Sequence, residues 1–460
     1  MSVPEIERQI GIETYVTRTP GIGGAIRRWV EDFVVEEVLV DGSKASVEAD
    51  ANAAGKPALG ASAQRQRFLL CVLVKRNWDT FIALKNLAKE LGVEQGRIQI
   101  AGIKDAKAIT AQHITIEGVL AEEAAKIQFK DIQLRPIGYF REQLCSFYLL
   151  GNNFKITLKA IPCPKQTAEE HIQNVAAEIK ATGGIPNFYG HQRFGTTRAI
   201  THLVGKAMVQ GNVEEAAMVF LAKPSIHEHP QSMQARSALW DTRDFAGALR
   251  DFPSQLRFER TMLRHLVEHA GDFSGAFRCL PLKLRMLFVQ AWQSYLFNRF
   301  LSARIRAGFS LGKAEVGDYV VNVERSGLPM TKTGKLAGPA DAAAFNGLIE
   351  AGKMRLALPI FGARQKLSQG AMGELEQAVL QEEGVEAGGF RVPDMPEVCA
   401  KGELRAAVCP VYDFSAGNAS ADPGAEQLQV ALQFRLLRGS YATVLLREIM
   451  KPTDLIASGF

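Results

Sequence analysis

Strand-forming segments occur near both ends of this 460-residue chain, and a long helical and mixed segment separates them. Apolar residues recur at every second position from Leu428 to Leu436, which predicts a strand, and an amphipathic helix follows over residues 441–450. Residues 25–40 and 68–74 predict strands near the other end of the chain. We therefore expect one sheet domain built from both ends of the chain and interrupted by an inserted domain.

The remaining elements of the sheet domain follow from apolar patterns and helix-capping residues. Asp79 precedes a helical apolar pattern that stops at Gly92, and a second helix is expected over residues 168–181. The segment over residues 41–66 has few large apolar residues and predicts a loop. Further strands are expected at 97–101, 112–116, 132–139 and 154–160.

Composition indicates a globular protein, since 47% of the residues are hydrophobic and 22% are charged. The net charge of +5 is too small for this length to indicate a nucleic-acid partner by itself. The six cysteines are scattered and contain no C-x-x-C pair, which is typical of reduced thiols in a cytosol. No secretion signal and no membrane-length apolar segment is recognised, so we expect a cytoplasmic protein that does not bind membranes.

Motifs for cofactors and metals are weak or absent. No Walker-type loop occurs, and Gly21–Gly24 has the wrong spacing for a dinucleotide fold, so we expect no cofactor. His265 and His269 match the H-x-x-E-H pattern of one class of zinc peptidase, but no third ligand is identifiable. We expect no metal; a zinc hydrolase remains an alternative that predicts bound zinc.

The loop around Asp105 is the first candidate site. Asp105 follows Lys104, precedes Lys107 and lies on a turn that begins at Gly102 between two expected strands. A carboxylate held beside cations stays ionised and can attack an electrophilic carbon without a metal. The alternative is an ordinary surface turn.

The second candidate site lies between Asn187 and Gly195 and contains aromatic, amide and arginine side chains. Aromatic rings stack on an unstacked base, amides such as that of Gln192 pair with its edge, and Arg193 can contact a phosphate. The alternative is a buried aromatic loop whose polar groups are satisfied within the protein.

Both loops resemble signatures of the TruD family of tRNA pseudouridine synthases, in its longer, archaeal and eukaryotic-like form. Three further segments are similar to family motifs, in family order along the chain. The resembling segments are 31–37, 74–80, 101–112, 187–195 and 439–448.

The resemblance implies an α+β fold: a pseudouridine synthase core with a mixed, largely antiparallel sheet and flanking helices, interrupted by a family-specific α/β insertion (TRUD) domain. The core corresponds to residues 1–212 plus 399–460, and the insertion to 213–398. A cleft between the two domains is expected to hold RNA.

The resemblance also implies roles for individual residues. Asp105 is the expected catalytic aspartate, with Arg27 and Lys104 as supporting cations. The expected uridine pocket consists of Phe33, Asn187, Tyr189 and Tyr441. RNA contacts are expected from Lys75, Lys107, Gln192, Arg193 and Arg447.

The implied activity is isomerisation of a tRNA uridine, position 13 of the D arm, to pseudouridine, with tRNA as partner and no cofactor. Asp105 would add to the pyrimidine ring, or attack or deprotonate the sugar, and the sequence does not separate these routes. A departure from the family pattern is the single arginine in Gly402–Arg405, where a pair is expected. The alternative from another functional class is an RNA-binding protein or chaperone that keeps the pocket without turnover.

Overall fold

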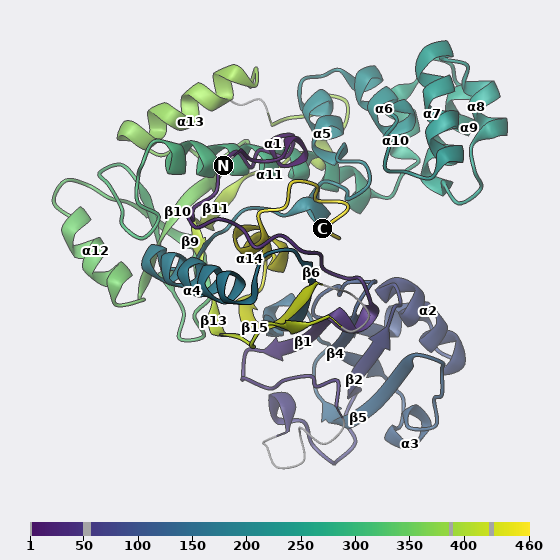
Figure 1. The fold of residues 1–460 in the computed structure, drawn as a ribbon. Coiled ribbons are helices and arrows are strands. Elements are labelled where there is room, and N and C mark those ends of the chain that lie inside the picture. The colour runs from purple at the N-terminus through teal and green to yellow at the C-terminus, as the bar shows by residue number, and fades with distance from the viewer. Residues whose placement is uncertain (1, 49–56, 386–389, 423–426) are drawn as a thin grey trace. The chain divides into compact units, whose positions relative to one another are not determined.

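The chain forms two compact units, and each is assembled from segments that are distant in the sequence. The computed structural model describes residues 2–48, 57–385, 390–422 and 427–460 (Figure 1). The large-sheet unit comprises Thr17–Ile185, Arg325–Leu328 and Cys409–Phe460. The helical unit comprises Met1–Val16, Pro186–Glu324 and Pro329–Val408. Residues 1–16, 186–212 and 399–408, which the sequence analysis groups with the sheet domain, thus belong to the helical unit.

The large-sheet unit is built on a nine-stranded sheet in the order β13-β15-β6-β1-β4-β2-β5, with β3 paired to β4 and β14 paired to β15. Strands β1 and β4 are parallel, and the other pairings are antiparallel. The expected mixed, largely antiparallel sheet is therefore confirmed. The strands are β1 (Phe33–Leu39), β2 (Phe68–Arg76), β3 (Ile98–Ile100), β4 (Ile109–Glu117), β5 (Ile132–Phe140), β6 (Leu149–Ile161), β13 (Tyr412–Ala416), β14 (Ser420–Ala421) and β15 (Leu428–Leu437).

The C-terminal strand β15 lies inside this sheet, between β13 and β6. Leu432 pairs with Ile156, and Phe434 pairs with Phe154, whose ring stacks on it at a centroid distance of 5.2 Å. The sheet therefore joins the two ends of the chain, as the alternating pattern predicts.

Helix α2 (Thr80–Glu90) follows β2 and covers one face of the sheet. Its N-cap is Asp79, whose Oδ1 accepts hydrogen bonds from the backbone amides of Phe81 and Ile82. Leu84 and Leu87 of α2 pack into an apolar cluster with strand residues, and each buried leucine contributes roughly 1.5–3 kcal/mol. The expected strand and helix are both confirmed.

The first strand is shorter than expected. The extended segment predicted from residue 25 begins only at Phe33, because Val30–Asp32 form a 3-10 turn. The Oδ2 atom of Asp32 accepts a hydrogen bond of 2.7 Å from the Trp29 amide, and Arg27 has a φ of 56°. Both features interrupt an extended backbone. In the expected loop over residues 41–66, residues 49–56 lie outside the described part, and Ala58–Gly60 form a 3-10 turn.

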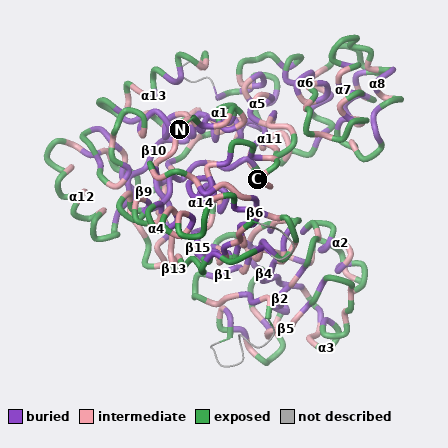
Figure 2. The backbone as a smooth tube through the Cα atoms, in the orientation of Figure 1, coloured by how far each residue is buried: buried purple, intermediate pink, exposed green. Residues whose placement is uncertain are grey.

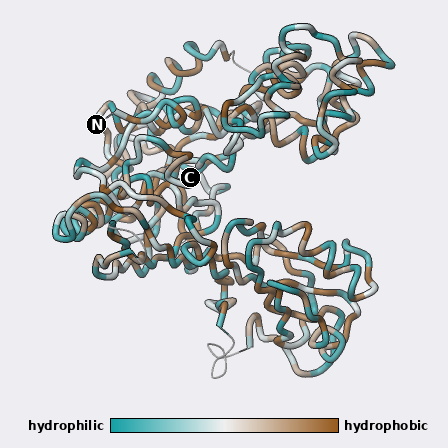
Figure 3. The backbone as a smooth tube through the Cα atoms, turned by 45° about the vertical axis from the view of Figure 1, so that its right-hand side comes forward, coloured by the Kyte–Doolittle hydropathy of each residue, from teal (hydrophilic) through white to brown (hydrophobic). Residues whose placement is uncertain are grey.

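Three more helices complete the large-sheet unit: α3 (Ala121–Ala124), α4 (Lys165–Thr182) and α14 (Ala442–Met450). Helix α14 contacts α4, and every residue of α14 is buried. Among the described residues, no helix is long and apolar enough to span a membrane, and Figure 3 shows hydrophobic and hydrophilic residues interspersed along the chain.

The helical unit contains a four-stranded sheet in the order β11-β10-β8-β9 and a long helix, α11 (Leu282–Arg306). Its strands are β8 (Tyr319–Val323), β9 (Pro329–Leu336), β10 (Met354–Ile360) and β11 (Glu403–Ala406). The other helices are α1 (Glu5–Arg8), α5 (Thr201–Val209), α6 (Val213–Ala222), α7 (Pro230–Thr242), α8 (Phe245–Asp251), α9 (Arg257–Glu268), α10 (Phe273–Arg278), α12 (Ala342–Glu350) and α13 (Gly370–Glu382). Strands β7 (Ile185–Pro186) and β12 (Val408–Cys409) pair in a separate two-stranded sheet.

Burial distinguishes the elements of the helical unit (Figure 2). Strand β10 is buried along its whole length, whereas α12 has no buried residue. Helix α11 contributes a continuous buried side that includes Trp292 and Phe297. The core of this unit therefore lies around α11 and β10.

Candidate active site

Asp105 lies on the connection between β3 and β4 and forms an ion pair with Arg27. The Nη2 atom of Arg27 donates to Oδ1 of Asp105 over 2.9 Å, and the Asp105 side chain remains 34% exposed. The guanidinium of Arg27 lies 4.1 Å from the centre of the Phe33 ring and donates from Nη1 to the Gly459 carbonyl. The structure thus brings Asp105, Arg27 and Phe33 together and leaves the carboxylate accessible.

Burial lowers the pKa of the Arg27 guanidinium from its ordinary value, while the attraction of Asp105 opposes that shift. An arginine stays protonated even when it is buried, so Arg27 keeps its positive charge beside Asp105. Phe33 is only 1% exposed, and the Arg27 guanidinium covers its ring. The expected uridine-pocket residue Phe33 therefore supports Arg27, and its covered face is not available to a base in this structure.

Lys104 does not support the Asp105 carboxylate as expected. Its Nζ lies 2.6 Å from Oε2 of Glu37, and both side chains are buried. His113 donates its backbone amide to Oε1 of Glu37 over 3.0 Å. Burial alone would raise the pKa of Glu37, but Lys104 and His113 together lower it. The buried ammonium of Lys104 has Glu37 as its counter-charge, so Lys104 holds the Asp105 loop against the interior of the unit.

Lys75 was expected to contact RNA, and the structure corrects this expectation. Lys75 is fully buried, and its Nζ donates to the carbonyls of Asp105 over 2.6 Å and Trp78 over 2.8 Å. Burial lowers its pKa to about 8. The hydroxyl of Thr80 donates to the Lys104 carbonyl over 3.0 Å. Lys75 and Thr80 therefore fix the backbone that carries the Asp105 carboxylate.

The other expected residues of the large-sheet unit differ in exposure. Arg447 is 1% exposed and pairs with Glu448 at 2.6 Å, so the expectation of an RNA contact is also corrected. Lys107 is exposed, as an RNA contact requires. Tyr441 is partly buried and precedes the first residue of α14 as its N-cap.

The second loop lies in the helical unit, where Asn187 is held by β11. The Asn187 Nδ2 donates to the Ala406 carbonyl over 3.0 Å, and Oδ1 accepts from Nη2 of Arg405 over 2.8 Å. The Arg405 guanidinium also lies 4.1 Å from the centre of the Tyr189 ring. Asn187 and Tyr189, both expected in the uridine pocket, are therefore joined by one arginine.

Arg405 was not among the expected site residues, because the single arginine in Gly402–Arg405 departs from the family pattern. The single guanidinium of Arg405 contacts both residues, since its planar fork donates to Asn187 and its face covers the Tyr189 ring. The signal in the sequence is an arginine next to the buried Leu404 on a strand, where alternation places the two side chains on opposite faces.

Arg193 and Gln192 follow on a 3-10 turn, η6 (His191–Arg193). Arg193 donates from Nε to the Ser294 hydroxyl over 3.1 Å and from Nη2 to Oε1 of Gln290 over 3.4 Å. Gln192 is exposed. Helix α11 therefore orients Arg193, while RNA contacts by both residues stay predictions.

The histidine pair of the alternative zinc site lies at the end of α9. The rings of His265 and His269 are 4.8 Å apart between centroids, and Nε2 of His265 contacts Oδ2 of Asp272 at 2.9 Å. Over the described ranges of the chain, no group of three or more His, Cys, Asp or Glu side chains could hold a metal ion.

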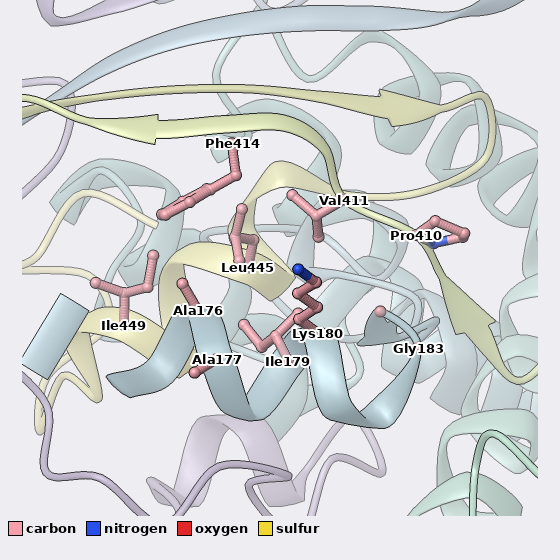
Figure 4. A pocket seen from close by; sticks show the side chains of 11 residues that line it. Ala176, Ala177, Ile179, Lys180, Gly183, Pro410, Val411, Phe414, Leu445 and Ile449 are labelled. Carbon is pink, nitrogen blue, oxygen red and sulfur yellow. The ribbon is translucent and has the colours of Figure 1, made fainter. Parts of the chain in front are cut away.

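An apolar cavity of about 410 Å3 in the large-sheet unit contains none of the expected site residues (Figure 4). Ile179 of α4 and Leu445 and Ile449 of α14 line it, together with Phe414 of β13. Lys180 brings the one charged side chain to this lining. The cavity lacks a carboxylate or nucleophile, so it is not a candidate active site.

Comparison with known proteins identifies one family. The family model of tRNA pseudouridine synthase D (TruD) matches residues 9–449. A probable tRNA pseudouridine synthase D of Methanosarcina mazei is 39% identical over 457 residues, which cover 99% of both chains. Its counterpart in Pyrococcus furiosus is 36% identical over 443 residues, 96% of this chain and 99% of that protein.

The fold is also similar to a solved structure. The crystal structure of the putative tRNA pseudouridine synthase D (TruD) from Methanosarcina mazei matches with a TM-score of 0.82 at 38% identity. The match covers 98% of this chain and 99% of that chain.

Proposed function

The chain belongs to the tRNA pseudouridine synthase D (TruD) family, and we propose that it converts a tRNA uridine to pseudouridine with Asp105 as its catalytic carboxylate. Uridine 13 of the D arm is the proposed target. The observation that carries the proposal is the ion pair of Arg27 with a partly exposed Asp105. A carboxylate of this kind is accessible to substrate, and its partner holds it in one orientation.

The reaction balances without a co-reactant. The bond between N1 of uracil and C1′ of ribose breaks, and a bond between C5 and C1′ forms. The C5 proton is released to solvent, and N1 ends protonated. The Asp105 carboxylate can act by adding to the pyrimidine ring, or by attacking or deprotonating the sugar. Arg27 stabilises its charge before that step and again when the carboxylate is regenerated.

The target base must leave its stack to meet Asp105, because the reacting bonds are inaccessible in stacked RNA. Arg405 supports this step in the proposal, since it holds the Asn187 amide and the Tyr189 ring in fixed positions. Asn187 and Tyr189 are proposed to recognise and stack on the base.

The test is release of tritium from tRNA transcript labelled at uridine C5. Wild-type protein is expected to release tritium, and Asp105→Asn is expected to release none above background. Asp131→Asn serves as the matched control, because Asp131 is exposed in the same unit and its side chain is not part of the proposed site. Release by Asp105→Asn at the wild-type rate would reject the proposed role of Asp105.

A protein that binds RNA without turnover would give a different result. Wild-type protein would then bind tRNA tightly but release no tritium from any uridine, and Asp105→Asn would bind equally well. Active wild type with an inactive Asp105→Asn variant excludes that alternative.

A further inference from the structure

A cavity of about 570 Å3 lies in the helical unit, and none of the residues expected at the active site lines it. This volume is within the range of small-molecule sites, roughly 300–1,000 Å3. The side chains that characterise it are cationic or aromatic. They are Arg198, His202, Lys206, Lys223, Trp292 and Tyr295.

The cavity carries more positive than negative charge. The one acidic residue in its lining, Glu383, accepts from the Tyr295 hydroxyl over 2.8 Å and from Nη1 of Arg299 over 2.5 Å, and it pairs with Lys206 at 2.8 Å. For Lys223 Nζ, no hydrogen bond or ion pair is found within the described residues. The uncompensated ammonium of Lys223 favours an anionic ligand.

Two buried rings in the lining retain hydrogen-bonding capacity. His202 and Trp292 are each 1% exposed, and in the described part of the chain His202 Nδ1 and Trp292 Nε1 have no hydrogen-bond partner. Burial lowers the pKa of His202 to about 3, and the charges of Lys223 and Lys206 act in the same direction. Buried polar groups usually have partners, so these two nitrogen atoms are exceptions among the described residues.

The rim of the cavity is an ordered turn with an exposed apolar side chain. Arg198 donates to the Lys223 carbonyl over 3.1 Å, and the Ser225 hydroxyl donates to the Thr197 carbonyl over 2.6 Å. Between Ser225 and His227, the side chain of Ile226 is 83% exposed. Apolar surface beside the uncompensated ammonium of Lys223 matches the two parts of a nucleotide, its base and its phosphate.

We propose that this cavity binds one nucleotide of the tRNA other than the reacting uridine, with its phosphate on Lys223 and Lys206 and its base against Ile226. The proposal rests on the proposed function, which makes tRNA the substrate. It adds a contact on the helical unit that positions the tRNA independently of Asp105.

The test measures the affinity for full-length tRNA as a function of salt. Lys223→Ala is expected to weaken binding roughly tenfold at low salt and to reduce the slope of log affinity against log salt by about one. Lys223→Arg is expected to restore both, since it keeps the charge. Ile226→Ala is expected to weaken binding with an unchanged slope. Lys353→Ala, an exposed lysine of the same unit outside the cavity, is the control and is expected to behave as wild type.

Two outcomes would overturn the proposal. In the first, Lys223→Ala matches Lys353→Ala in affinity and slope. In the second, AMP or inorganic phosphate binds in a Lys223-dependent manner while tRNA affinity does not depend on Lys223, which would assign the cavity to free anions. Both of these outcomes are measured as binding constants. A failure of the proposed role of Asp105 is measured separately, as tritium release by Asp105→Asn, so the two failures are distinguishable.

Discussion

The buried ammonium of Lys75 donates a hydrogen bond of 2.6 Å to the backbone carbonyl of Asp105. The same ammonium holds the Trp78 carbonyl at 2.8 Å, so one side chain ties the Asp105 loop to the end of β2. Lys75 therefore holds the backbone of the proposed catalytic residue, and its charge also attracts the Asp105 carboxylate.

Lys75→Met is expected to lower kcat by up to about a hundredfold while leaving the Kd for tRNA near the wild-type value. Methionine fills the space but leaves two partly buried carbonyls without this donor, which costs up to about 1–3 kcal/mol each and releases the loop. A misplacement of about 1 Å is enough for such a loss of rate. Single-turnover tritium release and filter binding measure the two quantities. An unchanged kcat would show that the loop holds its position without Lys75.

Arg27→Lys is expected to lower kcat/KM at least tenfold, although it keeps the positive charge. A lysine cannot both donate to Asp105 in the guanidinium geometry and cover the Phe33 ring at 4.1 Å. The matched control is Arg28→Lys, at an exposed neighbouring arginine, and it should retain wild-type kinetics. Equal losses in the two variants would mean that the loss does not come from the guanidinium geometry of Arg27.

The buried pair of Glu37 and Lys104 makes a prediction about stability. Glu37→Gln is expected to lower the free energy of unfolding by about 3–5 kcal/mol, because it leaves the Lys104 ammonium buried without a counter-charge. The double variant Glu37→Gln with Lys104→Met removes both charges and should lose less than the sum of the single losses. Urea denaturation of all four proteins completes the cycle. Additive losses would contradict a coupled pair.

Periodicity and capping were sufficient to predict most strands of the large sheet and its first helix, although β13 and β14 were not predicted. The apolar run of β2, the Asp79 cap and the alternation in β15 each act locally, so a short stretch of sequence contains the whole signal. The start of β1 was wrong because the hydrogen bond from Trp29 to Asp32 and the positive φ of Arg27 outweigh the apolar pattern. The alternation of apolar residues does not predict hydrogen bonds to a side chain such as that of Asp32.

The residues of the proposed site were harder to predict from the sequence than the strands and helices. Asp105 and Arg27 are 78 residues apart, and the resemblance rather than any spacing suggested their pairing. The resemblance implied an RNA contact for Lys75, but most of the neighbouring residues of β2 are buried. Lys75 is in phase with the buried Cys71 and Leu73 on β2, and this phase is a signal that it points inward. The roles of Asp105, Tyr441, Lys107, Gln192 and Arg193 stay predictions.

Arg405→Lys tests the connection between Asn187 and Tyr189. The Arg405 guanidinium bonds to the Asn187 side chain over 2.8 Å and covers the Tyr189 ring, and lysine supplies neither the fork nor the planar face. A charge-assisted hydrogen bond contributes about 1.5–3 kcal/mol, so kcat/KM for tRNA should fall roughly tenfold or more. Arg391→Lys, at an exposed arginine of the same unit, is the control. Wild-type kinetics for Arg405→Lys would show that the contacts of Arg405 with Asn187 and Tyr189 do not matter for the reaction.

Glu376 on α13 makes the stability of the helical unit depend on pH. Burial raises its pKa to about 8, although the amide and hydroxyl of Ser368 donate to its carboxyl oxygens over 2.7 and 2.9 Å. Asp318 raises the pKa further, and Arg304 opposes it. A carboxyl group whose folded pKa exceeds its unfolded value of 4.5 stabilises the fold fully below pH 4.5, and this contribution is lost as the pH rises towards 8.

The free energy of unfolding should therefore fall between pH 5 and 8 by up to about 1.4 kcal/mol per pH unit from this group. Glu376→Gln removes this titrating group. The free energy of unfolding of wild type, relative to that of the variant, should therefore fall as the pH rises from 5 to 8. Glu374→Gln, at an exposed position of the same helix, should leave the pH dependence of wild type unchanged. Urea denaturation at pH 5, 6, 7 and 8 measures each difference. A constant difference between wild type and Glu376→Gln would mean that Glu376 is ionised in the folded protein throughout, with its charge compensated by Ser368 and Arg304.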